Sequence, residues 1–165
     1  MAYHIYTTKG IVLSSRPSRE ADKMYSILTE DLGLVHARAG GVRLEKSKLR
    51  GFLEPYALVN VSLVRGKAEW RLTSAELVET FPLSLHIARP LALIERLIVG
   101  EEVHPEIFQI ARDFLGNPKL DTDAETRFVA HVLFELGYMR EEDLALSGKE
   151  LIQAVNLGLR TSHLV

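Results

Sequence analysis

The spacing of apolar residues changes once along this chain, and that change limits the possible folds more than any short motif. From Thr8 to about Glu79, apolar and polar residues alternate at every second position, as they do in strands with one buried face. After Phe81-Pro82 the apolar residues recur at the helical spacing of three and four positions. The sequence therefore predicts strands followed by helices, with no repeat or flexible linker between them.

The alternating region predicts five strands. They are Gly10–Ser15, Lys23–Thr29, Leu34–Ala39, a strand that contains Ala57–Val64, and a strand that begins near Trp70. Asp31-Leu32-Gly33 and Arg65-Gly66-Lys67 indicate hairpin turns. A five-stranded antiparallel unit of this size suits a small barrel such as the OB fold, and a short sandwich is the alternative.

Four segments of the second half have helix signals. Leu91, Ile94 and Leu97 form an apolar stripe, with Pro90 expected near the helix start. Pro105 is expected to open the next helix. Capping boxes precede two further helices, at Thr122-x-x-Glu125 with Gly137 as the terminating glycine, and at Ser147-x-x-Glu150. We predict an α+β protein, with an OB-fold barrel over residues 1–80 and a small helical domain over residues 81–165 that packs on the barrel.

Composition removes several classes of protein. With 47% hydrophobic and 25% charged residues, the chain has enough apolar material to fold. Its richest apolar stretch, residues 90–100, is interrupted by Glu95 and Arg96 and is too short to cross a membrane. The absence of cysteine excludes disulfides, thiol catalysis and zinc sites that use cysteine. Because the first residues lack an apolar leader, we expect a soluble, cytoplasmic protein without membrane contact.

Charge is divided unevenly between the two halves of the chain. Residues 1–72 contain twelve Lys and Arg against seven Asp and Glu, whereas residues 73–165 contain eight against fifteen. A basic half in an acidic chain is typical of proteins with an anionic partner, although ordinary scatter of charge explains it equally well.

No segment has the pattern of an active site. Gly40–Ser47 has Gly, Lys and Ser at the positions of a phosphate-binding loop, but Glu45 replaces the second glycine and would repel a phosphate. Glu101-x-x-His104 is half of a di-iron pair whose second copy is missing. We therefore predict a protein that is not an enzyme and that holds no metal and no cofactor.

The segment RAGGVRLEKSKLR, residues 38–50, is the strongest candidate for function. It carries five basic side chains against Glu45 alone, and long loops in compact domains are usually functional or disordered. Such a cluster on a barrel loop suits a nucleic-acid backbone, and the neighbouring Phe52, Tyr56 and Trp70 offer faces on which bases could stack. The alternative is a solvated loop with these aromatics in the core, and alternation with Arg71 favours the core position for Trp70.

Several spaced segments resemble the start of RecO, the bacterial recombination mediator. They are Thr8–Leu13, Arg16, Glu20–Asp22, Leu28–Glu30, Gly33-Leu34, Ala39–Arg43 and Lys46-Ser47-x-Leu49-Arg50-Gly51-x-Leu53-x-Pro55. The similarity covers about residues 8–80, becomes loose through Phe134–Tyr138 and is faint afterwards. RecO chains are commonly longer, and many carry a four-cysteine zinc site that this chain lacks.

The resemblance implies an N-terminal OB fold, a C-terminal helical domain and a role in DNA repair. RecO proteins bind single- and double-stranded DNA, anneal complementary strands, and load RecA together with RecR and the single-strand-binding protein. The family's DNA contacts are basic residues of the barrel and its long loop. Here they correspond to Arg38, Arg43, Lys46, Lys48 and Arg50, with Arg16, Arg19 and Lys23 as additions. The alternatives are an OB-fold protein that binds RNA, and a protein-interaction adaptor whose basic loop is inert.

Overall fold

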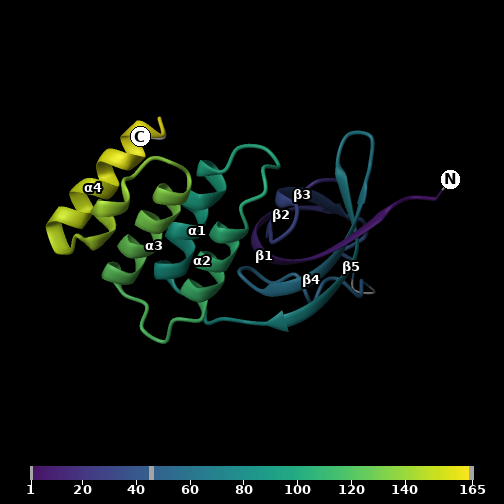
Figure 1. Cartoon of the computed structure of the whole chain (residues 1–165). Coiled ribbons are helices and arrows are strands. Elements are labelled where there is room, and N and C mark those ends of the chain that lie inside the picture. Colours follow the sequence, from purple (N-terminus) through teal and green to yellow (C-terminus); the bar gives the residue numbers. More distant parts are fainter. Residues whose placement is uncertain (1, 45–46, 164–165) are drawn as a thin grey trace. The chain divides into compact units, whose positions relative to one another are not determined.

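The structure, a computed structural model, describes residues 2–44 and 47–163. Figure 1 shows strands followed by helices, in the order that the sequence predicts. The strands are β1 (Ile5–Pro17), β2 (Lys23–Thr29), β3 (Gly33–Ala39), β4 (Leu58–Arg65) and β5 (Trp70–Glu79). The helices are α1 (Leu85–Leu97), α2 (Pro105–Leu115), α3 (Thr122–Glu135), the short 3-10 helix η1 (Glu141–Ala145) and α4 (Gly148–Thr161).

The five strands close into a barrel in the order β1-β2-β3-β5-β4, which confirms the OB fold over the sandwich alternative. All neighbours pair antiparallel except β3 and β5, which pair parallel through Ala37 with Trp70 and Arg38 with Arg71. The prediction of a wholly antiparallel unit is therefore wrong at this one pair. An odd number of strands cannot alternate in direction around a closed ring, so one parallel pair is unavoidable.

β1 is longer than predicted because it serves two partners. Its first half pairs with β4 from Ile5 to Ile11, and its second half pairs with β2 from Gly10 to Pro17. A bulge between Val12 and Ser14 shifts the register of β1 against β2, just after the part of β1 that pairs with β4. Gly10 lies where β1 pairs with both β2 and β4. A Cβ atom at this position would lie 2.5 Å from a methyl carbon of Ile27.

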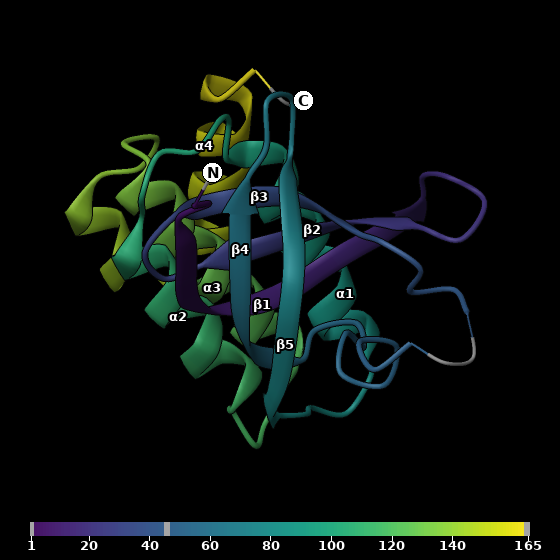
Figure 2. The same cartoon turned by 90° about the vertical axis from the view of Figure 1, so that its right-hand side faces the viewer.

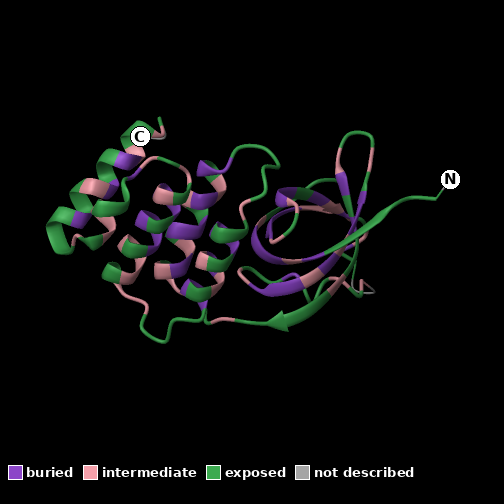
Figure 3. Ribbon diagram, in the orientation of Figure 1, coloured by how far each residue is buried: buried purple, intermediate pink, exposed green. Residues whose placement is uncertain are grey.

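The barrel core follows the predicted alternation. The inward positions of β4, which are Val59, Val61 and Leu63, are fully buried. Trp70 is only 6% exposed and belongs to the same core, which confirms the interpretation drawn from its alternation with Arg71. Beyond Leu72, most of β5 is exposed, as its green arrow in Figure 3 shows.

The first two helices show one error of prediction and one success. α1 begins after Ser84, whose hydroxyl accepts a hydrogen bond from the backbone N–H of His86, so Pro90 lies inside the helix and not near its start. Pro90 is itself buried beside Leu91 in the apolar stripe, and this burial offsets the one backbone hydrogen bond that proline cannot make. α2 begins at Pro105 as predicted.

The last two helices have different caps from those expected. The carboxylate of Asp121 accepts from the N–H of Ala124, so α3 is capped one residue before the predicted Thr122. Gly137, with φ of +82°, follows its end as predicted. Ser147 precedes α4, but its side chain makes no capping hydrogen bond.

The chain divides into two compact units, residues 1–82 with 99–108, and residues 83–98 with 109–165. Residues 99–108 thus group with the barrel, whereas the predicted boundary at residue 80 assigns them to the helical domain. The packing of the helices on the barrel stays a prediction. Among the described residues, every helix is too short or too polar to span a membrane.

Candidate nucleic-acid interface

The loop between β3 and β4 is fixed to the barrel by apolar side chains and by backbone hydrogen bonds. Val42 and Leu53 are buried in the barrel core. The backbone N–H of Arg43 donates to the carbonyl oxygen of Ala21 at 3.0 Å. Ala21 belongs to the turn between β1 and β2, so this bond holds the loop against that turn. Figure 2 shows both segments leaving the barrel at the same edge.

These bonds bring together basic residues that are separate in the sequence. Arg19 lies in the turn to which Arg43 is bonded, Lys23 follows that turn, and Arg16 is one position before the pair Pro17–Lys23. Lys48 and Arg50 are exposed further along the loop, and Lys46 lies outside the described residues. We call the six described cations the loop surface: Arg16, Arg19, Lys23, Arg43, Lys48 and Arg50. None of them forms an ion pair with a carboxylate in the described part of the chain.

Arg38 differs from the loop surface because two carboxylates hold it. Its side chain is 18% exposed and bonds both to Asp22, at 3.1 Å, and to Glu69. These hydrogen bonds raise the pKa of Arg38, the one from Glu69 more than the one from Asp22. The two carboxylates engage Nε and Nη1 of Arg38, so two of the five N–H donors of the group are used, and its positive charge is already balanced. Its predicted role as a DNA contact stays a prediction, and in this structure it joins β3 to the β1–β2 turn and to the β4–β5 hairpin.

Asp22 connects this ion pair to the long loop. Its second carboxylate oxygen accepts a hydrogen bond from the backbone N–H of Gly41 at 2.8 Å. That bond is the main cause that lowers the pKa of Asp22, with a further contribution from Arg38. Gly41 has φ of +67°, a left-handed conformation that glycine adopts without steric cost. The start of the loop is therefore fixed by a charged hydrogen bond.

Three further cations, which were not predicted from the sequence to be functional, lie on the β4–β5 hairpin. Arg65 ends β4, Lys67 lies in the turn, and Arg71 points outward between two core residues of β5. The predicted turn is confirmed, with the N–H of Gly66 bonded to the carbonyl oxygen of Glu69. The alternation that predicts Trp70 inside the barrel also predicts Arg71 outside it. That signal could have identified Arg71 as an exposed cation of the barrel.

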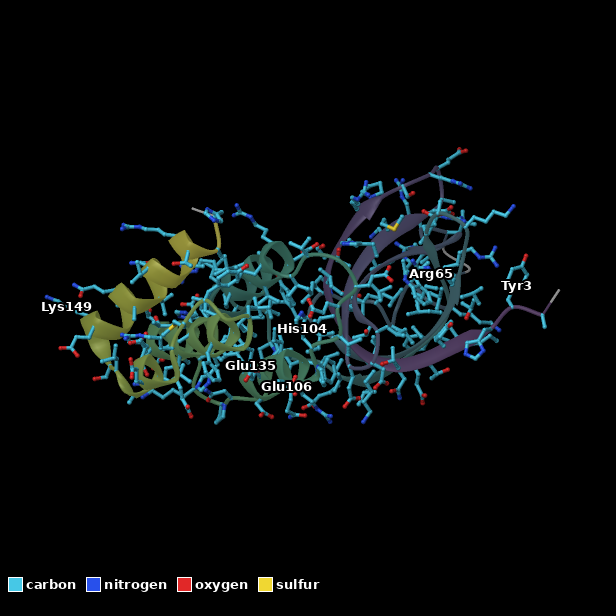
Figure 4. All side chains as sticks on the ribbon, turned by 45° about the horizontal axis from the view of Figure 1, so that its top comes forward. Tyr3, Arg65, His104, Glu106, Glu135 and Lys149 are labelled. Atoms are coloured by element: carbon cyan, nitrogen blue, oxygen red, sulfur yellow. The ribbon has the colours of Figure 1, made fainter. Side chains whose placement is uncertain are left out.

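A hollow of about 480 Å³ lies beside this hairpin. We call it the hairpin groove, and it is lined by Tyr3, Arg38, Val64–Glu69 and Arg71. Figure 4 shows Tyr3 and Arg65 at the same end of the barrel.

Arg65 of the hairpin groove is held by one carboxylate and one aromatic ring. It pairs with Glu101 and lies over the ring of Trp70, 4.8 Å from the ring centre. The indole N–H of Trp70 donates to the other oxygen of Glu101 at 2.8 Å. Lys67 and Arg71, in contrast, have no ion pair with a described carboxylate.

The predicted absence of catalytic and metal chemistry stays a prediction. In the described residues, no three His, Asp or Glu side chains gather as metal ligands would. His86 and Arg89 both bind the carboxylate of Glu125, which links α1 to α3 within the helical unit. His131 is exposed on α3.

The fold defines this chain as an OB-fold barrel protein with a C-terminal set of helices. Residues 1–81 match the family described as "Recombination protein O N terminal". Two proteins named DNA repair protein RecO, from two strains of Dehalococcoides mccartyi, are 33% identical to it over 149 residues and 31% identical over 169 residues. The chain belongs to the RecO family, which confirms the resemblance found in its sequence.

These alignments cover 84% and 93% of the chain, which spans 58% and 65% of the lengths of the two relatives. Among solved structures, asparaginyl-tRNA synthetase of Entamoeba histolytica has a TM-score of 0.40 and 12% identity, covering 84% of this chain and 33% of that one. A structural similarity with so low a TM-score and identity supports no conclusion about function.

Proposed function

We propose that this chain is a non-enzymatic DNA-binding protein of DNA repair, which captures single- and double-stranded DNA and anneals complementary strands. The observation that carries the proposal is the loop surface, whose six cations have no ion pair with a described carboxylate. The bond between Arg43 and Ala21 gathers part of this charge beside the β1–β2 turn. The family to which the chain belongs, whose relatives are named for DNA repair, supports the same conclusion.

The proposed mechanism is electrostatic. Lys and Arg that neutralise phosphates release condensed counterions, and this release favours binding regardless of sequence. Contacts to phosphate carry no information about the bases, so two complementary strands are captured equally well. Neutralising the phosphates also reduces repulsion between the strands, which then pair through their exposed bases. Neither a nucleotide cofactor nor a metal enters this scheme.

We further propose that the chain works with RecR and the single-strand-binding protein to load RecA. Support for these partners comes from membership of the RecO family. Because the chain spans less than two thirds of the two relatives compared here, each partner needs a binding measurement with this chain itself.

The test is strand annealing with two complementary labelled DNA oligonucleotides. We expect the protein to accelerate annealing without nucleotide and equally in the presence of a chelator. An unlabelled RNA of the same sequence serves as competitor. Competition by RNA at concentrations well below those of DNA would favour the RNA-binding alternative. No binding of either nucleic acid would contradict the proposal and favour the adaptor.

A further inference from the structure

The hairpin groove has the features of a nucleic-acid site in its own right. We infer that it binds the backbone of single-stranded DNA and stacks one base on Tyr3, continuing the path of a strand that lies on the loop surface. The inference rests on the proposed DNA binding and adds a site that lies outside the loop.

The position of Arg71 follows from the closure of the barrel. The parallel pair of β3 and β5 sets Arg71 opposite Arg38, and the antiparallel pair of β5 and β4 sets it opposite Val64. Residues opposite one another on paired strands point to the same side of the sheet. Since Trp70 and Leu72 point into the core, Arg71 and Arg38 point outward, where both line the groove.

The groove contains more positive charge than its own carboxylates neutralise. Four cations line it, against the single lining carboxylate of Glu69. Asp22 and Glu69 hold Arg38, and Glu101 holds Arg65, so Lys67 and Arg71 remain available. Phosphate oxygens form the same charged hydrogen bonds as a carboxylate, so a phosphate in the groove can also replace Glu69 on Arg38.

Tyr3 gives the groove an aromatic surface. Its side chain is 64% exposed although it lines the groove. In the residues that follow it, His4 packs edge-on against Tyr6, and Tyr6 packs edge-on against Trp70, with ring centres 4.3 and 5.3 Å apart. Cations that follow a backbone, combined with an exposed ring for a base, are the elements of single-strand binding. In a duplex the bases are paired and stacked, so Tyr3 favours a single strand.

A short set of ionic contacts connects the groove to the loop surface. The Asp22 carboxylate bonds Gly41 of the long loop on one oxygen and Arg38 on the other. Arg38 in turn bonds Glu69 of the hairpin. A DNA strand that leaves the loop surface at this point therefore meets Arg38 first, and then Lys67 and Arg71 in the groove.

The first test replaces Lys67 and Arg71 with Glu in the full chain. Both side chains are exposed, so the fold should survive, which circular dichroism and urea unfolding check. We expect affinity for a single-stranded oligonucleotide to fall at least about tenfold at low salt. The slope of log affinity against log salt should become shallower by about 1.4, at about 0.7 for each lost phosphate contact. The matched control Lys149→Glu with Arg160→Glu makes the same charge change on α4 and should bind within about twofold of the unmodified chain.

The second test is Tyr3→Ala, which removes a ring and no charge. We expect affinity for single-stranded DNA to fall about tenfold with an unchanged salt slope, and affinity for duplex DNA to stay the same. If the Lys67 and Arg71 variant binds single strands as well as the unmodified chain does, the groove is not a binding site, although the proposed function stands. If Tyr3→Ala has no effect on single strands, the stacking site is contradicted. If the unmodified chain binds no DNA, the proposed function itself fails.

Discussion

Replacing Arg43, Lys48 and Arg50 with Glu is expected to lower the affinity for single-stranded DNA on the order of 100-fold or more at low salt, because each lost phosphate contact becomes a repulsive one. All three side chains are exposed, and the hydrogen bond that Arg43 makes to Ala21 uses its backbone, so the loop should keep its position. Annealing of complementary strands should be lost together with binding. Fluorescence anisotropy measures the affinity, and circular dichroism checks the fold.

The control for this variant makes the same charge change on helices of the second unit. Arg96, Lys149 and Arg160 are exposed, and all three lie outside the loop surface and the hairpin groove. Their replacement with Glu should retain most of the DNA affinity, because it leaves all the cations of the loop surface and the hairpin groove in place. Equal losses in the two variants would show that total charge, and not the loop surface, determines binding.

The second large effect concerns stability. Gly33→Ala is expected to lower the free energy of unfolding by about 3 kcal/mol, the sum of backbone strain and a steric clash. Gly33 has φ of +75°, and a Cβ atom there would lie 2.5 Å from the backbone carbonyl oxygen of Glu102. A backbone atom cannot move aside as a flexible side chain can, so the turn or the segment around Glu102 must shift. Urea unfolding measures the change.

Gly100→Ala separates the two contributions. Gly100 also has φ of +75°, but a Cβ atom there would meet nothing within 4 Å. This variant should lose only the strain, about 1 kcal/mol. If the two alanine variants were equally stable, the close approach of Gly33 to Glu102 would be wrong. The same variants test the position of Glu101, which binds Arg65 and Trp70.

Much of the barrel could be predicted from local pattern. Alternation identified β2 at its observed bounds, the inward face of β4 and the core position of Trp70, because side chains of a strand point to opposite faces in turn. The same rule could not show that β1 pairs with both β2 and β4. That property depends on the bulge after Val12 and on the absence of a side chain at Gly10, where Ile27 lies close.

The candidate site was predicted less completely, because ion pairs depend on contacts between distant segments. In the sequence, nothing distinguishes Arg38 from the other basic residues near it. Its partners, Asp22 and Glu69, are 16 and 31 positions away, and the folding of β2 and β5 against β3 brings them to it. Arg71 was not predicted because it is not part of a basic cluster along the chain and lies opposite Arg38 only across the paired strands β3 and β5.

The helix starts show a similar limit. A proline was expected close to the beginning of its helix, and Pro90 instead lies in the interior of α1, on its buried face. The free energy of burying Ile87, Leu91 and Ile94 is not visible in any local signal at the helix start. At α3, Asp121 and Thr122 are adjacent and both are good N-cap residues, so only the backbone geometry decides between them.

The central claim is that exposed cations on the barrel hold the phosphate backbone of DNA, and its most direct test is a salt series. Affinity for a single-stranded oligonucleotide is measured by anisotropy from low to physiological salt. The account predicts a straight line of log affinity against log salt, with a slope of about −3 or steeper, since each phosphate contact contributes about −0.7. Four or more of the six loop-surface cations in contact with phosphates would give this slope. An affinity that stays constant across the series would contradict the account.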